Sequence, residues 1–309
     1  MGCALLAGST ACAALWPAPA PQSADAKPSA ETKPSGETGP SAETGPSAAA
    51  EPSQDPKSVF LESLRRQATQ PVIATVQEHY QREDAYPGGS RKVVVSAFDY
   101  RSKAIKLEES EVSVTDGRPR VIRATRCAAG TERFWTDHSR RWENRGSKCP
   151  SPVDPLWIND GIGIGGLTKE QAGALVETLD GYQGLIHGDS VTTVRRDGRP
   201  YLRLDVTVRH MKLGDGASAG ASMFGDAVKT IDVDVAGHPY GWLGGDPGLK
   251  IVRLVDPETL LPVYSQMEET ETGWRMHRVQ YDFDGPIGTS DLPKTPEVAR
   301  MTWEPEKSQ

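Results

Sequence analysis

The stretch VTTVRRDGRPYLRLDVTVRH, residues 191–210, decides the fold class. From Tyr201 to His210, apolar and polar side chains alternate, and the apolar side consists of Leu202, Leu204, Val206 and Val208. A period of two is typical of a strand with one buried and one solvated face. The pair Asp197-Gly198 favours a tight hairpin turn to a preceding strand over residues 191–195. The stretch therefore predicts two paired antiparallel strands.

The same pattern recurs on both sides of this hairpin. Further strands are expected over residues 92–100, 105–114, 118–126, 133–143, 229–235, 249–255, 261–268 and 274–283. Turn residues separate several of them, for example Asp116-Gly117 and Thr272-Gly273. The strand–helix–strand alternation that a parallel sheet needs does not occur. The sequence therefore predicts an α+β fold with a long antiparallel sheet.

Helical periodicity marks a few segments. Residues 59–80 carry apolar side chains three and four positions apart, and Pro71 is expected to kink or split this helix. A second helix is expected over residues 168–179, where Thr168 and Gln171 fit a capping box and Gly181 fits a stop. A short third helix fits residues 223–228.

The N-terminal segment MGCALLAGSTACAALW, residues 1–16, is small, apolar and uncharged. It matches the apolar core of an export signal but lacks the basic residues that usually precede one. Ser9-Thr10-Ala11-Cys12 is similar to a bacterial lipobox, in which a cysteine after small residues is acylated. We therefore expect lipidation at Cys12. The alternatives are a plain signal cleaved at Ala18 or Ala20, or a cytosolic protein.

A repetitive segment follows. Residues 27–56 repeat six-residue units with Pro and Ser in fixed places: KPSAET, KPSGET, GPSAET, GPSAAA and EPSQDP. None of these side chains can build a core, so the segment is expected to be a disordered, extended tether. The expected organisation is a signal and lipobox region over 1–20, the tether over 21–57, the α+β domain over 58–300 and a tail over 301–309.

Charge and cysteine content limit the possibilities further. The net charge of −7 argues against a nucleic-acid-binding surface, which normally needs a basic face. The body contains no run near the roughly 18 apolar residues of a spanning helix. Cys127 and Cys149 are the only cysteine pair of the body, and we expect a disulfide between them, which suits an oxidising compartment. A zinc site is the alternative, but no CxxC pair or spaced histidine cluster accompanies the two cysteines.

Two glycine-containing motifs match the patterns of known catalytic or binding loops. Residues 161–166 satisfy GxGxxG, but without the preceding strand and immediate helix of a dinucleotide site they fit a glycine connector. Residues 216–220 satisfy GxSxG, with Ser218 as nucleophile and Asp246 or Asp256 with His277 as partners. The parallel sheet of that hydrolase elbow is not predicted. A secreted serine hydrolase therefore stays an alternative only.

Histidines and carboxylates give no stronger signal. The six histidines show no metal-ligand spacing, and His210 is expected on the apolar face of its strand as a core histidine. Asp232 and Asp234 share one face of a predicted strand, and a solvated face explains both. The sequence predicts no catalytic constellation, no metal site and no cofactor.

The order of elements resembles the LolA-type superfamily, which includes actinobacterial lipoproteins of the LppX and LprG kind and the sigma-factor regulator RseB. The stretch IVRLVDPETLLPVYSQMEETETGWRMHRVQYDF, residues 251–283, carries the resemblance most clearly. It is similar to the family's closing hairpin, with Asp256, Thr259 and Pro262 in the turn. Residues 133–135 and 141–143 also resemble the family's early aromatic hairpin. The resemblance implies a sheet curved into an open half-barrel with helices covering the concave face.

A half-barrel of this kind implies a function in binding. An apolar concave face can hold acyl chains, at about 0.8 kcal/mol for each buried CH₂ group, without any catalytic residue. We therefore expect an exported, membrane-anchored lipoprotein on the outer face of the cell membrane or in the periplasm that binds a lipid or acyl chain as carrier or sensor. The candidate cavity residues are Leu202, Leu204, Val206, Val208, Val263, Met267, Trp274 and Met276.

Two other interpretations of the same face stay open. The helices over 59–80 and 168–179 could cover it completely and make an ordinary core. Alternatively, its groove could bind an envelope protein partner, as in a sigma-factor regulator.

Overall fold

The computed structural model describes residues 55–80, 91–113, 115–146, 164–212, 218–219, 222–231 and 248–283. Several predictions fall outside these ranges: lipidation of Cys12, nearly all of the tether, the C-terminal tail, and the positions of Cys149, Asp232, Asp234 and Asp246.

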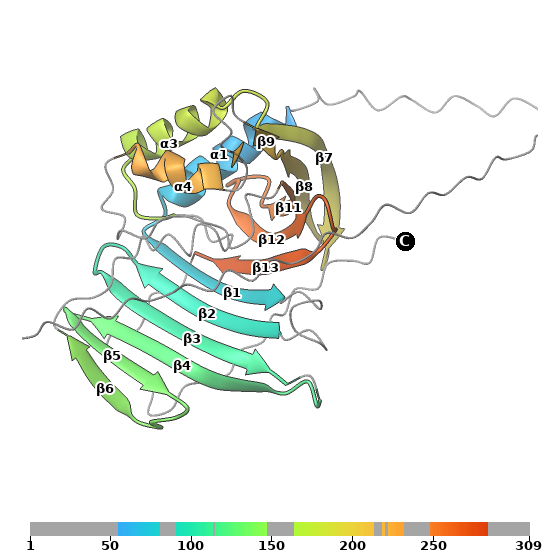
Figure 1. The fold of residues 1–309 in the computed structure, drawn as a ribbon. Coiled ribbons are helices and arrows are strands. Elements are labelled where there is room, and N and C mark those ends of the chain that lie inside the picture. Colours follow the sequence, from blue (N-terminus) through green and yellow to red (C-terminus); the bar gives the residue numbers. More distant parts are fainter. Residues whose placement is uncertain are drawn as a thin grey trace, which may run out of the picture. The chain divides into compact units, whose positions relative to one another are not determined.

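A single antiparallel sheet of eleven strands dominates the part of the chain described (Figure 1). Its strand order is β6-β5-β4-β3-β2-β1-β13-β12-β11-β8-β7. The bounds are β1 (Val72–Tyr80), β2 (Arg91–Asp99), β3 (Ala104–Val112), β4 (Pro119–Ala128), β5 (Thr131–Thr136), β6 (Trp142–Gly146), β7 (Ile186–Arg196), β8 (Arg199–Val208), β11 (Leu249–Val255), β12 (Pro262–Glu269) and β13 (Arg275–Asp282). Two short strands, β9 (Met211–Lys212) and β10 (Ser218–Ala219), pair only with each other.

The sheet is open, because β6 and β7 stand at opposite ends of the strand order and do not pair with each other. The predicted fold class, α+β with a long antiparallel sheet in an open half-barrel, is therefore confirmed. The strand predictions from alternation are also confirmed in most places. They include the hairpin that decided the fold class, with Asp197 and Gly198 in its turn at positive φ.

The helix α1 (Pro56–Ala68) begins two residues inside the predicted tether. Asp55 caps it, because its carboxylate accepts a hydrogen bond from the Ser58 N–H at 3.0 Å. Pro56 suits the first helical turn, where its missing N–H has no partner to lose. The helix buries the side chains of Val59, Phe60, Leu61, Ser63, Gln67 and Ala68.

The prediction of one kinked helix over residues 59–80 is wrong in its second half. Past Pro71 the chain forms β1, which pairs antiparallel with β2 on one side and β13 on the other. The apolar residues of this segment fit a helical period, but their β-branched side chains, such as Val72 and Ile73, favour a strand. Pairing with β2, the next strand, and with β13, which is distant in sequence, then decides the outcome.

The other two described helices agree with the sequence. In α3 (Lys169–Gly181) the capping box is present: Gln171 N–H donates to Thr168 Oγ1 at 3.2 Å, and Thr168 N–H donates to Gln171 Oε1 at 3.0 Å. The short helix α4 (Ser222–Lys229) is also confirmed. The strand predicted from residue 229 does not begin there, because Lys229 ends α4 and Ile231 lies in a turn.

The helices gather over one end of the sheet (Figure 1). α1 contacts β7 and β8, α3 packs on α1, and α4 packs on α3. Gly188 on β7 allows this close approach, because a Cβ there would lie 2.3 Å from the backbone N of Lys57. Within the described ranges, no helix is both long and apolar enough to cross a membrane.

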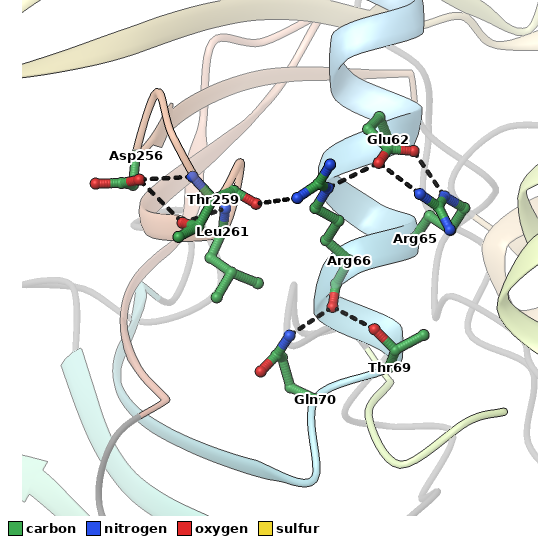
Figure 2. Close-up of polar contacts among 8 residues, drawn as sticks. All are labelled: Glu62, Arg65, Arg66, Thr69, Gln70, Asp256, Thr259 and Leu261. Carbon is green, nitrogen blue, oxygen red and sulfur yellow. Dashed lines mark hydrogen bonds and ion pairs between the residues drawn. The ribbon is translucent and has the colours of Figure 1, made fainter. Parts of the chain in front are cut away.

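A turn between β11 and β12 connects this helical layer to the sheet (Figure 2). Asp256 Oδ1 accepts hydrogen bonds from the backbone N–H of Glu258 at 3.0 Å and from both the N–H and the hydroxyl of Thr259, at 2.8 and 3.0 Å. The Thr259 carbonyl in turn accepts a hydrogen bond from Arg66 Nη1 of α1 at 3.3 Å. The Asp-x-x-Thr turn therefore also positions the C-terminal part of α1.

Candidate functional site

An apolar layer separates the helices from the sheet. On β8, Leu204, Val206 and Val208 all have 0% exposure, and the register places Leu249 and Ile251 of β11 beside Val208 and Val206. The layer is one continuous cluster of buried side chains from the three helices and the strands. Its helical members are Val59, Phe60, Leu61 and Ala68 of α1, Ala172, Leu175 and Leu179 of α3, and Ala227 and Val228 of α4.

The structure brings most of the predicted cavity residues into this layer. The buried members are Leu204, Val206, Val208 and Met276, and the partly buried ones at its margin are Leu202, Met267 and Trp274. Val263 is partly buried on β12. Helices therefore cover the β8 part of the face, as the core interpretation expects. The margin near Met267 and Trp274 is less deeply buried.

One charged side chain interrupts the layer. Arg253 of β11 is 4% exposed and lies on the same face as Ile251 and Val255. Its Nη2 donates a hydrogen bond to Gln67 Oε1 of α1. Its guanidinium carbon lies 5.8 Å from the ring centroids of both Phe60 and Tyr281. Burial lowers the pKa of the Arg253 guanidinium, against a smaller raising effect of Tyr281.

Other buried arginines have carboxylate partners. Arg278 of β13 forms an ion pair with Glu78 of β1, and Arg126 of β4 forms one with Glu108 of β3. Within the described part of the chain, no ion pair involves Arg253. Its charge is therefore the exception among these buried guanidiniums.

A second polar group lies where β1 meets β13. The rings of His79 and His277 make an edge-to-face contact with centroids 4.6 Å apart. Burial lowers the pKa of His79 to about 4, although the Glu109 carboxylate raises it and Lys92 lowers it further. Burial and the nearby His79 also hold the pKa of His277 well below its usual value. Both rings are therefore neutral at pH 7.

Of the residues predicted as hydrolase partners, Asp246 lies outside the described ranges, and the described Asp256 and His277 lie far apart. Ser218 lies on β10, which pairs with β9 and is not part of the main sheet. Asp256 is engaged in its own turn. The register aligns His277 with Met267 and Ile251, two strands away, and Asp256 follows the end of β11, five residues beyond Ile251, so the backbones of His277 and Asp256 are roughly 19 Å apart.

Two further sequence interpretations can be compared with the structure. His210 follows the end of β8 and is exposed, so its prediction as a core histidine is wrong. Gly165 and Gly166 pack on Tyr100. A Cβ on Gly165 would lie 2.4 Å from the Tyr100 ring, and a Cβ on Gly166 would lie 2.4 Å from the Tyr100 Cβ. Backbone bonds from Gly166 to Gln70 and from Leu167 to Ala68 connect this segment to the end of α1. These contacts fit a packed connector. In the described ranges, no group of three or more His, Cys, Asp or Glu side chains could hold a metal ion.

No protein-family model and no curated protein sequence matches this chain. Solved structures do match it. LprF from Mycobacterium bovis is 10% identical with a TM-score of 0.39, covering 76% of this chain and 96% of LprF. The MucA/MucB complex of Pseudomonas aeruginosa gives 13% identity and a TM-score of 0.31, over 81% of this chain and 67% of that one.

A LolA superfamily protein from Nitrosomonas europaea is 10% identical with a TM-score of 0.22, over 74% of this chain and 92% of its own. Because all three TM-scores are below 0.5, none of these likenesses says what this chain binds.

Arg253 is not among the residues predicted for the site, although its strand carries a signal for it. In LKIVRLV, residues 249–255, the buried face reads Leu249, Ile251, Arg253 and Val255. A charged residue among alternating apolar ones is the pattern that could have identified it.

Proposed function

We propose that this protein binds a hydrophobic ligand, a lipid or acyl chain, between its helices and its open sheet, as a carrier or sensor. The observation that carries this proposal is the margin of the apolar layer. There the buried cluster continues into the partly buried side chains of Met267 and Trp274. Flexible methionine and broad tryptophan side chains suit ligands of variable shape.

The contacts of the helices support entry of a ligand at this margin. Polar contacts connect the helices to one another: Lys57 of α1 pairs with Asp180 of α3 at 2.6 Å, and Thr178 of α3 bonds Thr230, next to α4, at 3.3 Å. The three helices therefore form one connected layer over the sheet. A chain that enters between the two layers breaks no backbone hydrogen bond of the sheet, because those bonds run between strands.

We propose further that the protein is exported and anchored in the bacterial cell envelope by acylation of Cys12. The proline-rich segment would hold the α+β domain away from the membrane surface. Three sequence features support this location: the apolar start, the lipobox-like Ser9–Cys12, and the repeats of residues 27–56.

Mass spectrometry of the exported protein tests both parts of the proposal. Native spectra are expected to show a mass excess that disappears on denaturation, because a bound lipid is released. Denaturing spectra are expected to retain the mass of the acyl groups on Cys12. An intact mass that is identical under both conditions and equal to the unmodified chain would contradict both parts.

A fluorescent fatty-acid probe tests the position of the ligand. Met267→Glu places a carboxylate at the margin of the apolar layer. It is expected to lower the affinity for the probe by about tenfold or more, because burying a charge is unfavourable. Thr192→Glu makes the same carboxylate on the exposed face of β7 and is the matched control. Equal affinities for the two variants would place the ligand elsewhere.

A further inference from the structure

The surroundings of Arg253 include buried polar atoms that lack hydrogen-bond partners, and each of these atoms can donate. In the described chain, Arg253 Nε, Gln67 Nε2 and Ser63 Oγ are buried and have no hydrogen-bond partner. The three residues are 4%, 1% and 0% exposed. A guanidinium carries only donors, and an amide nitrogen also only donates. Buried donors that lack acceptors are unfavourable, and a buried charge without a counter-ion is more so.

These donors belong to one place in the fold. Gln67 hydrogen-bonds Arg253 directly, and Phe60 of the same helix lies against the guanidinium. Ser63 lies between Phe60 and Gln67 on the buried stripe of α1, at the helical spacings of three and four residues. Ser265, which is 2% exposed, stands directly opposite Arg253 on β12.

The place is continuous with the apolar layer. Leu204 of β8 stands directly opposite Arg253, and Val206 and Val208 follow beside Ile251 and Leu249. Along β11 the apolar face extends from Arg253 to Leu249 over four residues, which is about 13 Å. A cationic donor group therefore lies within the apolar face between α1 and the sheet, with Leu249 and Ile251 on one side of it along β11 and Val255 on the other.

We propose that Arg253, with Gln67 and Ser63, binds the anionic head group of the ligand whose chain occupies the apolar layer. This inference rests on the proposed function and adds the chemical class of the ligand, an amphiphile with a phosphate or carboxylate head. Oxygen atoms of such a head supply the acceptors that the three donors lack. They also supply the negative charge that Arg253 lacks, and arginine suits planar or bidentate recognition of both groups.

Two ligands with the same chain isolate the head group: monooleoylglycerol and its phosphate monoester. Titration calorimetry on protein freed of lipid is expected to show tighter binding of the phosphate ester to the wild type, by about 10- to 100-fold. Arg253→Met replaces the guanidinium by an unbranched apolar side chain and is expected to abolish this preference, with a much smaller change in the affinity for monooleoylglycerol. Arg65→Met is the matched control, because Arg65 lies on α1 but pairs with Glu62.

A stability measurement on the same variants is independent of lipid. Because Arg253 is buried without a carboxylate partner, Arg253→Met is expected to raise the melting temperature of the ligand-free protein. Inorganic phosphate is expected to raise the melting temperature of the wild type only slightly. Should Arg253→Met not fold, Gln67→Leu removes one donor, keeps the charge, and is expected to reduce the preference for the phosphate ester.

Three other outcomes of these binding experiments would refute the inference, each in a different way. If both lipids bind all variants equally, the hydrophobic site stands and Arg253 is not its anchor. If inorganic phosphate binds in an Arg253-dependent manner but neither lipid does, the site holds a free anion and the lipid head group is refuted. If neither lipid nor phosphate binds the wild type, both this inference and the proposed function fail.

Discussion

Substitution of Val206 by tryptophan tests how the helical layer lies on the sheet. Val206 is 0% exposed on β8, between Ile251 of β11 and Gly188 of β7. The start of α1 fills the space beside Gly188, since a Cβ there would lie 2.3 Å from Lys57 N. A tryptophan at position 206 must therefore displace α1 or distort β8. Overpacking of this kind costs about 1–3 kcal/mol, which lowers the melting temperature of a body of this size by about 2–12 °C.

Urea and thermal unfolding of lipid-free Val206→Trp measure this loss. Thr192→Trp is the matched control, because Thr192 is a β-branched residue on the exposed face of β7, and we expect a change within about 0.5 kcal/mol. If Val206→Trp is as stable as the control, α1 does not close over β8. The close packing inferred from Gly188 would then be wrong.

Three further outcomes follow from the structure. The folded-state pKa of His79, about 4, lies below the unfolded value near 6.5, so the free energy of unfolding should decrease by up to about 3 kcal/mol as the pH falls through this window. Urea unfolding at a series of pH values should show a weaker pH dependence for His79→Gln but not for His187→Gln. The same pH dependence in the wild type and both variants would contradict the assignment. Asp256→Ala removes the acceptor of three hydrogen bonds and should cost about 1 kcal/mol, whereas Asp256→Asn should cost less, and a neutral Asp256→Ala would show that the turn does not need its side chain. Non-reducing peptide mapping of exported protein should recover Cys127 linked to Cys149, and recovery of both as free thiols would refute the predicted disulfide.

Local patterns predicted much of the fold. Alternation located β8 and β11, Asp-Gly pairs located hairpins, and Thr168 with Gln171 located the start of α3, because each pattern reports a physical constraint within a few residues. The segment after Pro71 was predicted wrongly for the opposite reason. Its apolar residues fit two periods, and the pairing of β1 with its neighbour β2 and with β13, which is distant in sequence, decided between them.

The candidate site could be predicted only in part. Alternation placed Leu204 and Val206 on a buried face, which the structure confirms. Which helix covers that face depends on long-range contacts, such as Arg66 of α1 with Thr259, that no local pattern encodes. The prediction for His210 failed because β8 ends before it, so the alternation no longer applied.

Photo-cross-linking with a fatty acid that carries a diazirine near its methyl end tests the central claim most directly. The label reacts with side chains that line the bound chain, and peptide mass spectrometry locates the adducts. The account predicts adducts on peptides of α1, β8 and β12, including Met267, and competition by unlabelled fatty acid. Adducts confined to exposed side chains, such as Thr192 and Arg195 of β7, or labelling that excess fatty acid does not reduce, would contradict a ligand between the helices and the sheet.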